Sequence, residues 1–361
     1  MRYCLLILCL VLSTLSYSAE RDPDIYLKLL GQGLELILPA HQTFADQTVA
    51  LKKQTEELCQ VRTQESLDAA QKQWRSTMEA WMRVSVLQFG PLLENDQRLR
   101  IQAWPIRARL LTRGINQLES SETPPTLESI AHGTVAIQGL PALEVFLFRD
   151  NALTALEKGQ ACPALQTVAR HLVVLAKELN NRWQGDFGKD FGNPAGIPGG
   201  FDTPQQAYDE YMNGLVTAVQ QIKRRKLEDP LGLAGRPGKA NATESYLSGN
   251  SRANLHNSLN ALIEFLTGGQ GYGVEDDLLD QDPDGIAALI LNDRLNGITK
   301  YNSQLTMPLE DLVKPATAEA ESQREVVISL FKELSLLNRA FENQLFDALG
   351  VTRDFNSEDG D

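Results

Sequence analysis

Apolar residues recur every three or four positions along most of this sequence. In residues 24–61 they are Leu27, Leu30, Leu34, Leu38, Phe44, Leu51 and Leu58. Sustained alternation of apolar and polar residues, which marks a half-buried strand, is nearly absent. The spacing therefore predicts an all-α fold, and packed helical bundles are the economical way to bury such faces.

The same spacing predicts further helices along the chain. Their expected ranges are 66–87, 96–118, 127–148, 165–183, 208–227, 251–266, 286–295 and 317–349. A kink or break is expected at Pro39, because proline cannot donate a hydrogen bond to the carbonyl of Glu35. Trp104-Pro105 interrupts the range 96–118, since the residue before a proline avoids the helical region.

The length of 361 residues allows roughly two domains of about 150 residues each. A stretch rich in Gly, Pro and Phe is the best candidate for the connection between them. The segments "PALEVFL" (141–147) and "NALIEFL" (260–266) are faintly alike, which hints at a duplication. The predicted organisation is a signal peptide (1–19), an N-terminal helical bundle (20–184), a connecting loop (185–204) and a C-terminal helical bundle (205–361).

The first residues read as a secretory signal. Arg2 precedes an apolar run, Leu5 to Leu15, that is too short to span a bilayer. Cleavage is expected after Ser18. Lipidation at Cys9 is the less favoured alternative, because small residues do not precede it. No later segment is long and apolar enough to cross a membrane, so the sequence predicts an exported mature chain without a transmembrane segment.

Charge and composition argue against one class of protein and exclude another. Asp and Glu total 47 against 34 Lys and Arg, giving a formal net charge of −13. A nucleic-acid binder is disfavoured, because tracking a phosphate backbone requires clustered cations. Four His and four Cys exclude a zinc array rich in these residues. Cation binding is not excluded.

Two cysteines, Cys59 and Cys162, remain after signal removal. An isolated pair in an oxidising compartment often forms a disulfide. Such a bridge would tie the first long helix to a later one; two buried free thiols are the alternative.

Common catalytic motifs are missing from the sequence. None of the histidines begins a His-Glu-x-x-His motif, and neither a Gly-x-Ser-x-Gly elbow nor a phosphate-binding loop is present. The basic run Lys223 to Lys226 is interpreted as the end of a helix, where cations interact favourably with the helix dipole.

Five segments, taken together, carry a resemblance to a known family. They are "LPAHQTF" (38–44), "FGPL" (89–92), "RLRIQAWP" (98–105), "VAIQGLPALEVFLF" (135–148) and "SGNSRANL" (248–255). In this order and spacing the chain resembles the imelysin-like family of bacterial envelope proteins. It is most similar to the branch of predicted periplasmic proteins linked to iron regulation.

The resemblance implies two helical bundles related by duplication, with a functional site at their interface. It also implies a metallopeptidase classification and a link to iron uptake. The family's Gly-x-His-x-x-Glu hallmark falls on Gly139, Pro141 and Glu144, so proline replaces the histidine ligand. A catalytic zinc site needs about three protein ligands. The substitution therefore disfavours peptidase activity here.

The resemblance also predicts the members of the site. Those expected from the first half are Gly139, Glu144, Arg98 and Trp104, and those from the second half are Ser248 and Ser251. A carboxylate, a guanidinium and hydroxyls suit a small polar ligand or a hard cation, with Glu144 as the metal ligand. The alternative is that Glu144 pairs with an arginine and locks two helices.

The sequence thus favours a non-enzymatic periplasmic protein for iron acquisition. Its expected ligand is iron, another divalent cation or a small metal-associated molecule, and its expected partner is an envelope iron-uptake component. A metallopeptidase and an envelope interaction module are the alternatives.

Overall fold

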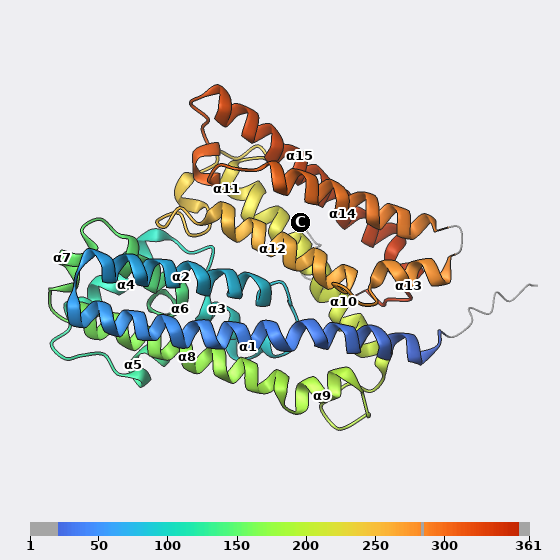
Figure 1. Cartoon of the computed structure of the whole chain (residues 1–361), viewed down its shortest axis with the longest axis horizontal. Helices are drawn as coiled ribbons and strands as arrows, with labels where there is room; N and C mark the ends of the chain where they lie inside the picture. The colour runs from blue at the N-terminus through green and yellow to red at the C-terminus, as the bar shows by residue number, and fades with distance from the viewer. Residues whose placement is uncertain (1–20, 283–284, 354–361) are drawn as a thin grey trace, which may run out of the picture.

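The computed structural model describes residues 21–282 and 285–353, so the predicted signal peptide lies outside the described residues. Within these ranges all regular secondary structure is helical, and no strand occurs (Figure 1). The predicted all-α class is confirmed. None of the helices in these ranges carries a stretch apolar and long enough to cross a membrane.

The first group of helices surrounds the long helix α1 (Pro23–Val61), which packs against α2 and α8 (Figure 1). Asp22 caps the start of α1 and Pro23 occupies its first turn, where a missing N–H is harmless. The other members are α2 (Gln64–Val84), α3 (Gln97–Ile101), α4 (Ala108–Glu119), α5 (Leu127–Ala131), α6 (Gly139–Phe148), α7 (Ala152–Leu156), α8 (Ala161–Gln184) and α9 (Asp186–Gly192).

The second group is built around α10 (Pro204–Gln221), which contacts both α12 and α15. The remaining members are the π-helix η4 (Ile222–Glu228), α11 (Asp229–Leu231), α12 (Ser251–Thr267), α13 (Val274–Gln281), α14 (Ile286–Gln304), α15 (Ala318–Ala340), the π-helix η7 (Phe341–Leu345) and α16 (Phe346–Leu349). The two groups meet where α12 packs on α2 and α10 packs on α1. The predicted duplication stays a prediction.

The core is continuous across both groups, and its largest side chains are aromatic. Trp74 and Trp81 of α2 are fully buried, as are Trp183 of α8 and Tyr208 of α10. A disulfide joins Cys59, near the end of α1, to Cys162, near the start of α8, with the Cα atoms 5.7 Å apart. The bridge thus fastens one end of the α1–α8 pair.

Several element boundaries differ from the predictions. The helix α1 continues through Pro39 as one element. The predicted helix 127–148 is interrupted between α5 and α6; just before α6, Gln138 is extended, and Gly139 at the start of α6 adopts a left-handed φ of 66°. The predicted connecting loop 185–204 contains the helix α9, which packs on α1 and α8.

The disulfide closes a long loop, since its cysteines are 103 residues apart. Closing such a loop restricts the unfolded chain, so we expect the Cys59→Ser/Cys162→Ser double variant to lose about 4 kcal/mol of unfolding free energy. Equilibrium denaturation in urea measures the loss. Reduced wild-type protein should unfold at the same midpoint as the variant. An unchanged midpoint in both would contradict a stabilising role for the bridge.

Candidate functional site

Glu144 connects the two groups of helices through Ser248. It lies on α6 and is only 5% exposed. One of its oxygens, Oε1, accepts hydrogen bonds from the backbone N–H of Ser248 at 2.9 Å and from its Oγ at 2.7 Å. Two of the predicted site residues are therefore in direct contact, one from each half of the chain.

Burial dominates the electrostatics of Glu144. Desolvation raises the pKa of its carboxyl to about 7, although both hydrogen bonds from Ser248 oppose the rise. The carboxyls of Glu244 and Glu310 raise this pKa further. Arg75 of α2 donates to the carbonyl oxygen of Ser248 at 2.7 Å. The carboxyl thus changes its charge near neutral pH, beside the segment that joins the two groups.

Ser251 is the first residue of α12, and it contacts Glu310 and Leu309 rather than Glu144. Its Oγ donates to Oε2 of Glu310 and accepts from the backbone N–H of Leu309 at 2.9 Å. Thr243 also donates to Glu310, at 3.4 Å. Ser251 therefore ties α12 to the short helix η6 (Leu309–Leu312), while Ser248 alone of the two serines binds Glu144.

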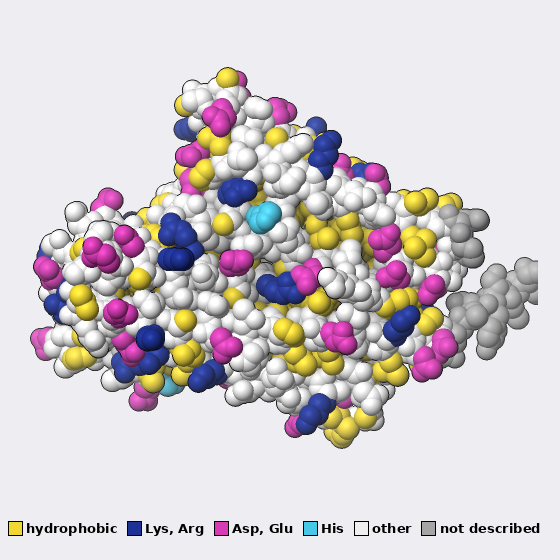
Figure 2. All heavy atoms as spheres, viewed as in Figure 1, with side chains coloured by type: hydrophobic (Ala, Val, Ile, Leu, Met, Phe, Trp, Pro, Cys, Tyr) yellow, Lys and Arg dark blue, Asp and Glu magenta, His cyan; other side chains and the backbone are white. Residues whose placement is uncertain are grey.

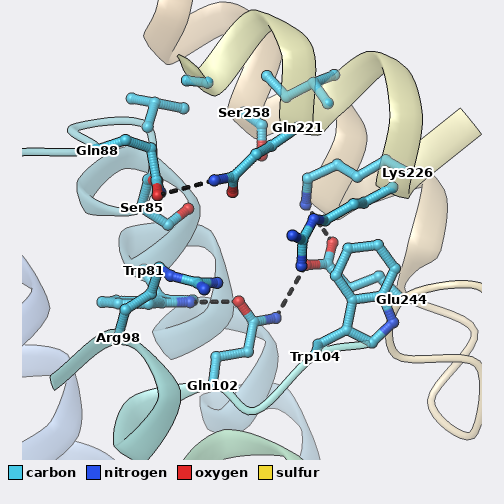
Figure 3. A pocket seen from close by; sticks show the side chains of 14 residues that line it. Trp81, Ser85, Gln88, Arg98, Gln102, Trp104, Gln221, Lys226, Glu244 and Ser258 are labelled. Carbon is cyan, nitrogen blue, oxygen red and sulfur yellow. Dashed lines mark hydrogen bonds and ion pairs between the residues drawn. The ribbon is translucent and has the colours of Figure 1, made fainter. Parts of the chain in front are cut away.

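Arg98 and Trp104 line a pocket of about 50 Å³, close to the volume of a few water molecules (Figure 3). Its walls come from both groups of helices. The first group contributes Trp81, Ser85, Val86, Gln88, Arg98, Gln102 and Trp104; the second contributes Ala218, Gln221, Ile222, Arg225, Lys226, Glu244 and Ser258.

A chain of hydrogen bonds crosses this pocket (Figure 3). The indole of Trp81 donates to Oε1 of Gln102 at 2.6 Å, and Nε2 of Gln102 donates to Oε1 of Glu244 at 2.9 Å. Lys226 forms an ion pair with Oε2 of Glu244, and its Nζ lies 5.6 Å from the ring centre of Trp104. Each group thus holds polar side chains of the other in fixed positions.

The pocket has the opposite charge balance to the chain. Its lining holds the cations Arg98, Arg225 and Lys226 against the single carboxylate of Glu244, whereas the whole sequence has a net charge of −13. On the face shown in Figure 2, acidic and basic side chains are interspersed over both groups.

The contact between Glu144 and Ser248 adjoins this pocket. Glu244 lines the pocket, and Ser248, four residues later, binds Glu144. The backbone of Ser245 accepts from the Ser248 hydroxyl at 3.0 Å, which makes the segment compact. One short segment thus reaches both the pocket, through Glu244, and Glu144, through Ser248.

Gly139 is needed for close packing. A Cβ atom at this position would collide with the backbone carbonyl oxygens of Arg100 and Ile101, and its φ of 66° is disfavoured for other residues. The glycine lets the start of α6 approach the end of α3. It thereby sets the distance between Glu144 and the segment that carries Arg98 and Trp104.

The sequence analysis missed Lys226, Glu244, Gln102 and Trp81 as members of the pocket. Lys226 belongs to the basic run interpreted as a helix end, but the helix turns there into the π-helix η4, and Lys226 is only 9% exposed. The only signal in the sequence was this basic run within an acidic chain. The π-helix itself, a feature that is frequent at functional sites, is visible only in the structure.

Raising the pH through the pKa of Glu144 should destabilise the fold. Its folded-state pKa of about 7 lies above the ordinary value of 4.5, so the stability is present at low pH and is lost as the pH rises between these values. We expect a loss of up to about 3 kcal/mol of unfolding free energy from pH 5 to pH 8. Glu144→Gln should remove most of this dependence in urea denaturation at several pH values.

Glu79, an exposed residue of α2, provides the matched control. Glu79→Gln should retain the wild-type pH dependence. Equal pH dependence in wild type and Glu144→Gln would show that Glu144 does not titrate in this range.

The family model for imelysin, which carries a peptidase designation, matches residues 37–337. An imelysin-like protein from Psychrobacter arcticum 273-4 has a similar fold, with a TM-score of 0.74 at 23% identity over 93% of this chain and 99% of that one. A putative iron-regulated protein A precursor from Parabacteroides distasonis ATCC 8503 has a TM-score of 0.72 at 15% identity, over 90% and 97% of the two chains. No curated protein sequence matches significantly. Since the family model spans most of the sequence, this chain belongs to the imelysin family.

Proposed function

We propose that this protein is an exported, non-enzymatic binding protein that serves iron acquisition. Its ligand is a small metal-associated molecule held in the pocket between the two groups of helices. The pocket itself carries the proposal, because Arg98 and Trp104 of the first group meet Lys226 and Glu244 of the second there. A small concave site with a few fixed polar groups is the usual form of a ligand site.

Two further observations support the link to iron and to export. The structural relative from Parabacteroides distasonis is described as iron-regulated and as a precursor. In the present sequence, residues 1–19 have the composition of a secretory signal. A periplasmic location follows from this proposal, together with an envelope iron-uptake component as the partner.

The residues present do not fit the catalytic zinc ion that a metallopeptidase requires. Proline occupies the position of the motif's histidine, and Glu144 Oε1 already accepts two hydrogen bonds from Ser248. Among residues 21–282 and 285–353, no group of three or more His, Cys, Asp or Glu side chains is placed to hold a metal. A zinc site needs about three such ligands. This donor set favours binding over hydrolysis, and Glu144 as a metal ligand stays a prediction.

Glu144 has a positioning role in the proposed function. Its hydrogen bonds to Ser248 hold the segment 244–248 in place. Glu244, at the start of this segment, lines the pocket. Glu244 in turn holds Lys226 and Gln102. The shape of the pocket therefore depends on a contact outside it.

Growth under iron limitation tests the proposed function. A strain of the source bacterium that lacks the gene should grow more slowly than wild type, and accumulate less cell iron, only when iron is scarce. Re-expression of the intact protein should restore both. Equal growth and iron content in the two strains under iron limitation would contradict a role in iron acquisition.

An assay of peptide hydrolysis tests the proposal that the protein is not an enzyme. We expect the purified protein to leave casein intact in the presence of zinc, because the site lacks the required ligands. Pro141→His is the informative comparison, since it restores the motif's imidazole. Turnover of casein by the wild-type protein that a chelator abolishes would show that it is a metallopeptidase.

A further inference from the structure

A second pocket, which shares no lining residue with the one between the two groups, lies around α9 and the loop that follows it (Figure 1). Its volume of about 790 Å³ lies within the range that is usual for small-molecule sites. Its walls come from the short helix η1 (Gly90–Leu92), the end of α8, α9, the loop and the first half of α10. The stretch rich in Gly, Pro and Phe therefore forms a pocket as well as a connection.

Acidic groups predominate in the lining of this pocket. Its carboxylates are those of Glu94, Asp186, Asp190 and Glu210. Arg182 is the one basic side chain among the lining residues. A concave site with this charge balance attracts cations.

Three of these carboxylates have partners within the protein. Both oxygens of Glu94 accept hydrogen bonds from Arg182, at 2.5 and 2.9 Å. Asp186 lies 3.9 Å from the ammonium group of Lys189, and Glu210 accepts a hydrogen bond from a backbone N–H. The fourth carboxylate, that of Asp190, is therefore the one on which a binding role depends.

Asp190 is buried without a full set of hydrogen bonds. It is only 8% exposed, and its Oδ2 accepts from the backbone N–H of Phe201 at 2.8 Å. Its other oxygen, Oδ1, is buried and has no hydrogen-bond partner among the residues that the structure describes. Burial of a carboxylate oxygen without a donor is unfavourable, and native folds rarely leave one unsatisfied. The lining of the pocket thus includes an acceptor for which the protein supplies no donor.

We propose that this pocket binds an alkylammonium group, with Asp190 as the residue that accepts its N–H. The inference is independent of the proposed function, because it concerns a different pocket. An ammonium group carries three N–H donors and a positive charge, so it satisfies both the hydrogen bond and the charge of the carboxylate. A metal ion fits less well, since among residues 21–282 and 285–353 no group of three or more His, Cys, Asp or Glu side chains is placed to hold one.

The apolar part of the lining suits an alkyl chain. Phe187 and Phe201 both line the pocket, with their ring centres 5.8 Å apart, and aromatic rings attract an ammonium group. Leu93 and Ile197 also line it, although they are 55% and 48% exposed. An alkyl chain that covered these two side chains would remove apolar surface from water.

The loop after α9 is held against Asp190. Besides the hydrogen bond from Phe201 to Asp190, the backbone N–H of Gly196 donates to the carbonyl of Phe201 at 3.2 Å. Gly200 permits the close approach, because a Cβ atom there would collide with the Asp190 carboxylate. The acceptor and the aromatic walls are therefore fixed relative to one another before a ligand binds, which lowers the entropic cost of binding.

Pentylamine titrated into the purified protein by calorimetry at pH 7 tests the proposal. We expect saturable binding that weakens with added salt, and at least about a tenfold loss of affinity in Asp190→Asn, because a charge-assisted hydrogen bond is lost. Asp202, an exposed residue of the same loop that does not line the pocket, provides the matched control. Asp202→Asn should bind pentylamine as wild type does, and thermal unfolding of both variants shows whether they are folded.

Two related compounds test the proposal on the wild-type protein alone, whatever the fate of the variants. Pentanol has the same alkyl chain without the charge, and tetramethylammonium has the charge without an N–H. Each should bind at least about tenfold more weakly than pentylamine, because each lacks one half of the interaction with Asp190.

A third compound, Nα-acetyl-lysine amide, distinguishes two sources of the alkylammonium group. Tighter binding than that of pentylamine identifies a lysine side chain of a peptide as the occupant, and weaker binding identifies a free amine; both support the site. The proposal is overturned if pentylamine does not bind, if pentanol or tetramethylammonium binds as tightly, or if Asp190→Asn and Asp202→Asn have equal affinities.

Discussion

The hydrogen bonds between Glu144 and Ser248 hold together the part of the molecule on which the candidate site depends. They join α6 of the first group to the segment before α12 of the second, and they bury a carboxyl with few compensating charges. Burial of a carboxylate is unfavourable unless it is well hydrogen-bonded. Burial therefore favours the protonated form of the Glu144 carboxyl at pH values where an exposed glutamate would be ionised.

The neighbouring pocket differs from Glu144 in how its buried carboxylate is compensated. There a carboxylate, Glu244, is buried with an ammonium group and an amide as partners, so its charge is satisfied within the protein. Removing either charge of such a pair leaves the other unpaired in a poorly solvated site. Lys226 and Glu244 therefore hold each other in place at the wall of the pocket. An acidic chain thus places three cationic side chains, those of Arg98, Arg225 and Lys226, around one pocket.

The sequence predicted the fold class and most long helices, because apolar spacing is a local property. It also brought Arg98, Trp104, Glu144 and Ser248 into consideration through resemblance to a family. It did not predict Lys226, Glu244 or the contact between Ser251 and Glu310, because these pairings join segments whose approach is decided by packing. The interruption of the range 127–148 ends at Gly139, where a Cβ atom would collide with the backbone of α3, and no local pattern records that approach.

Pro141 explains how the chain keeps the family fold without the motif's histidine. It is the third residue of α6, and the first four N–H groups of a helix have no partner within the helix. A proline there removes a donor that the helix does not use, and its fixed φ suits the first turn. The start of α6, the glycine before it and Glu144 one turn later therefore keep their positions. Proline at this position is therefore compatible with the backbone of α6, and the position carries no imidazole.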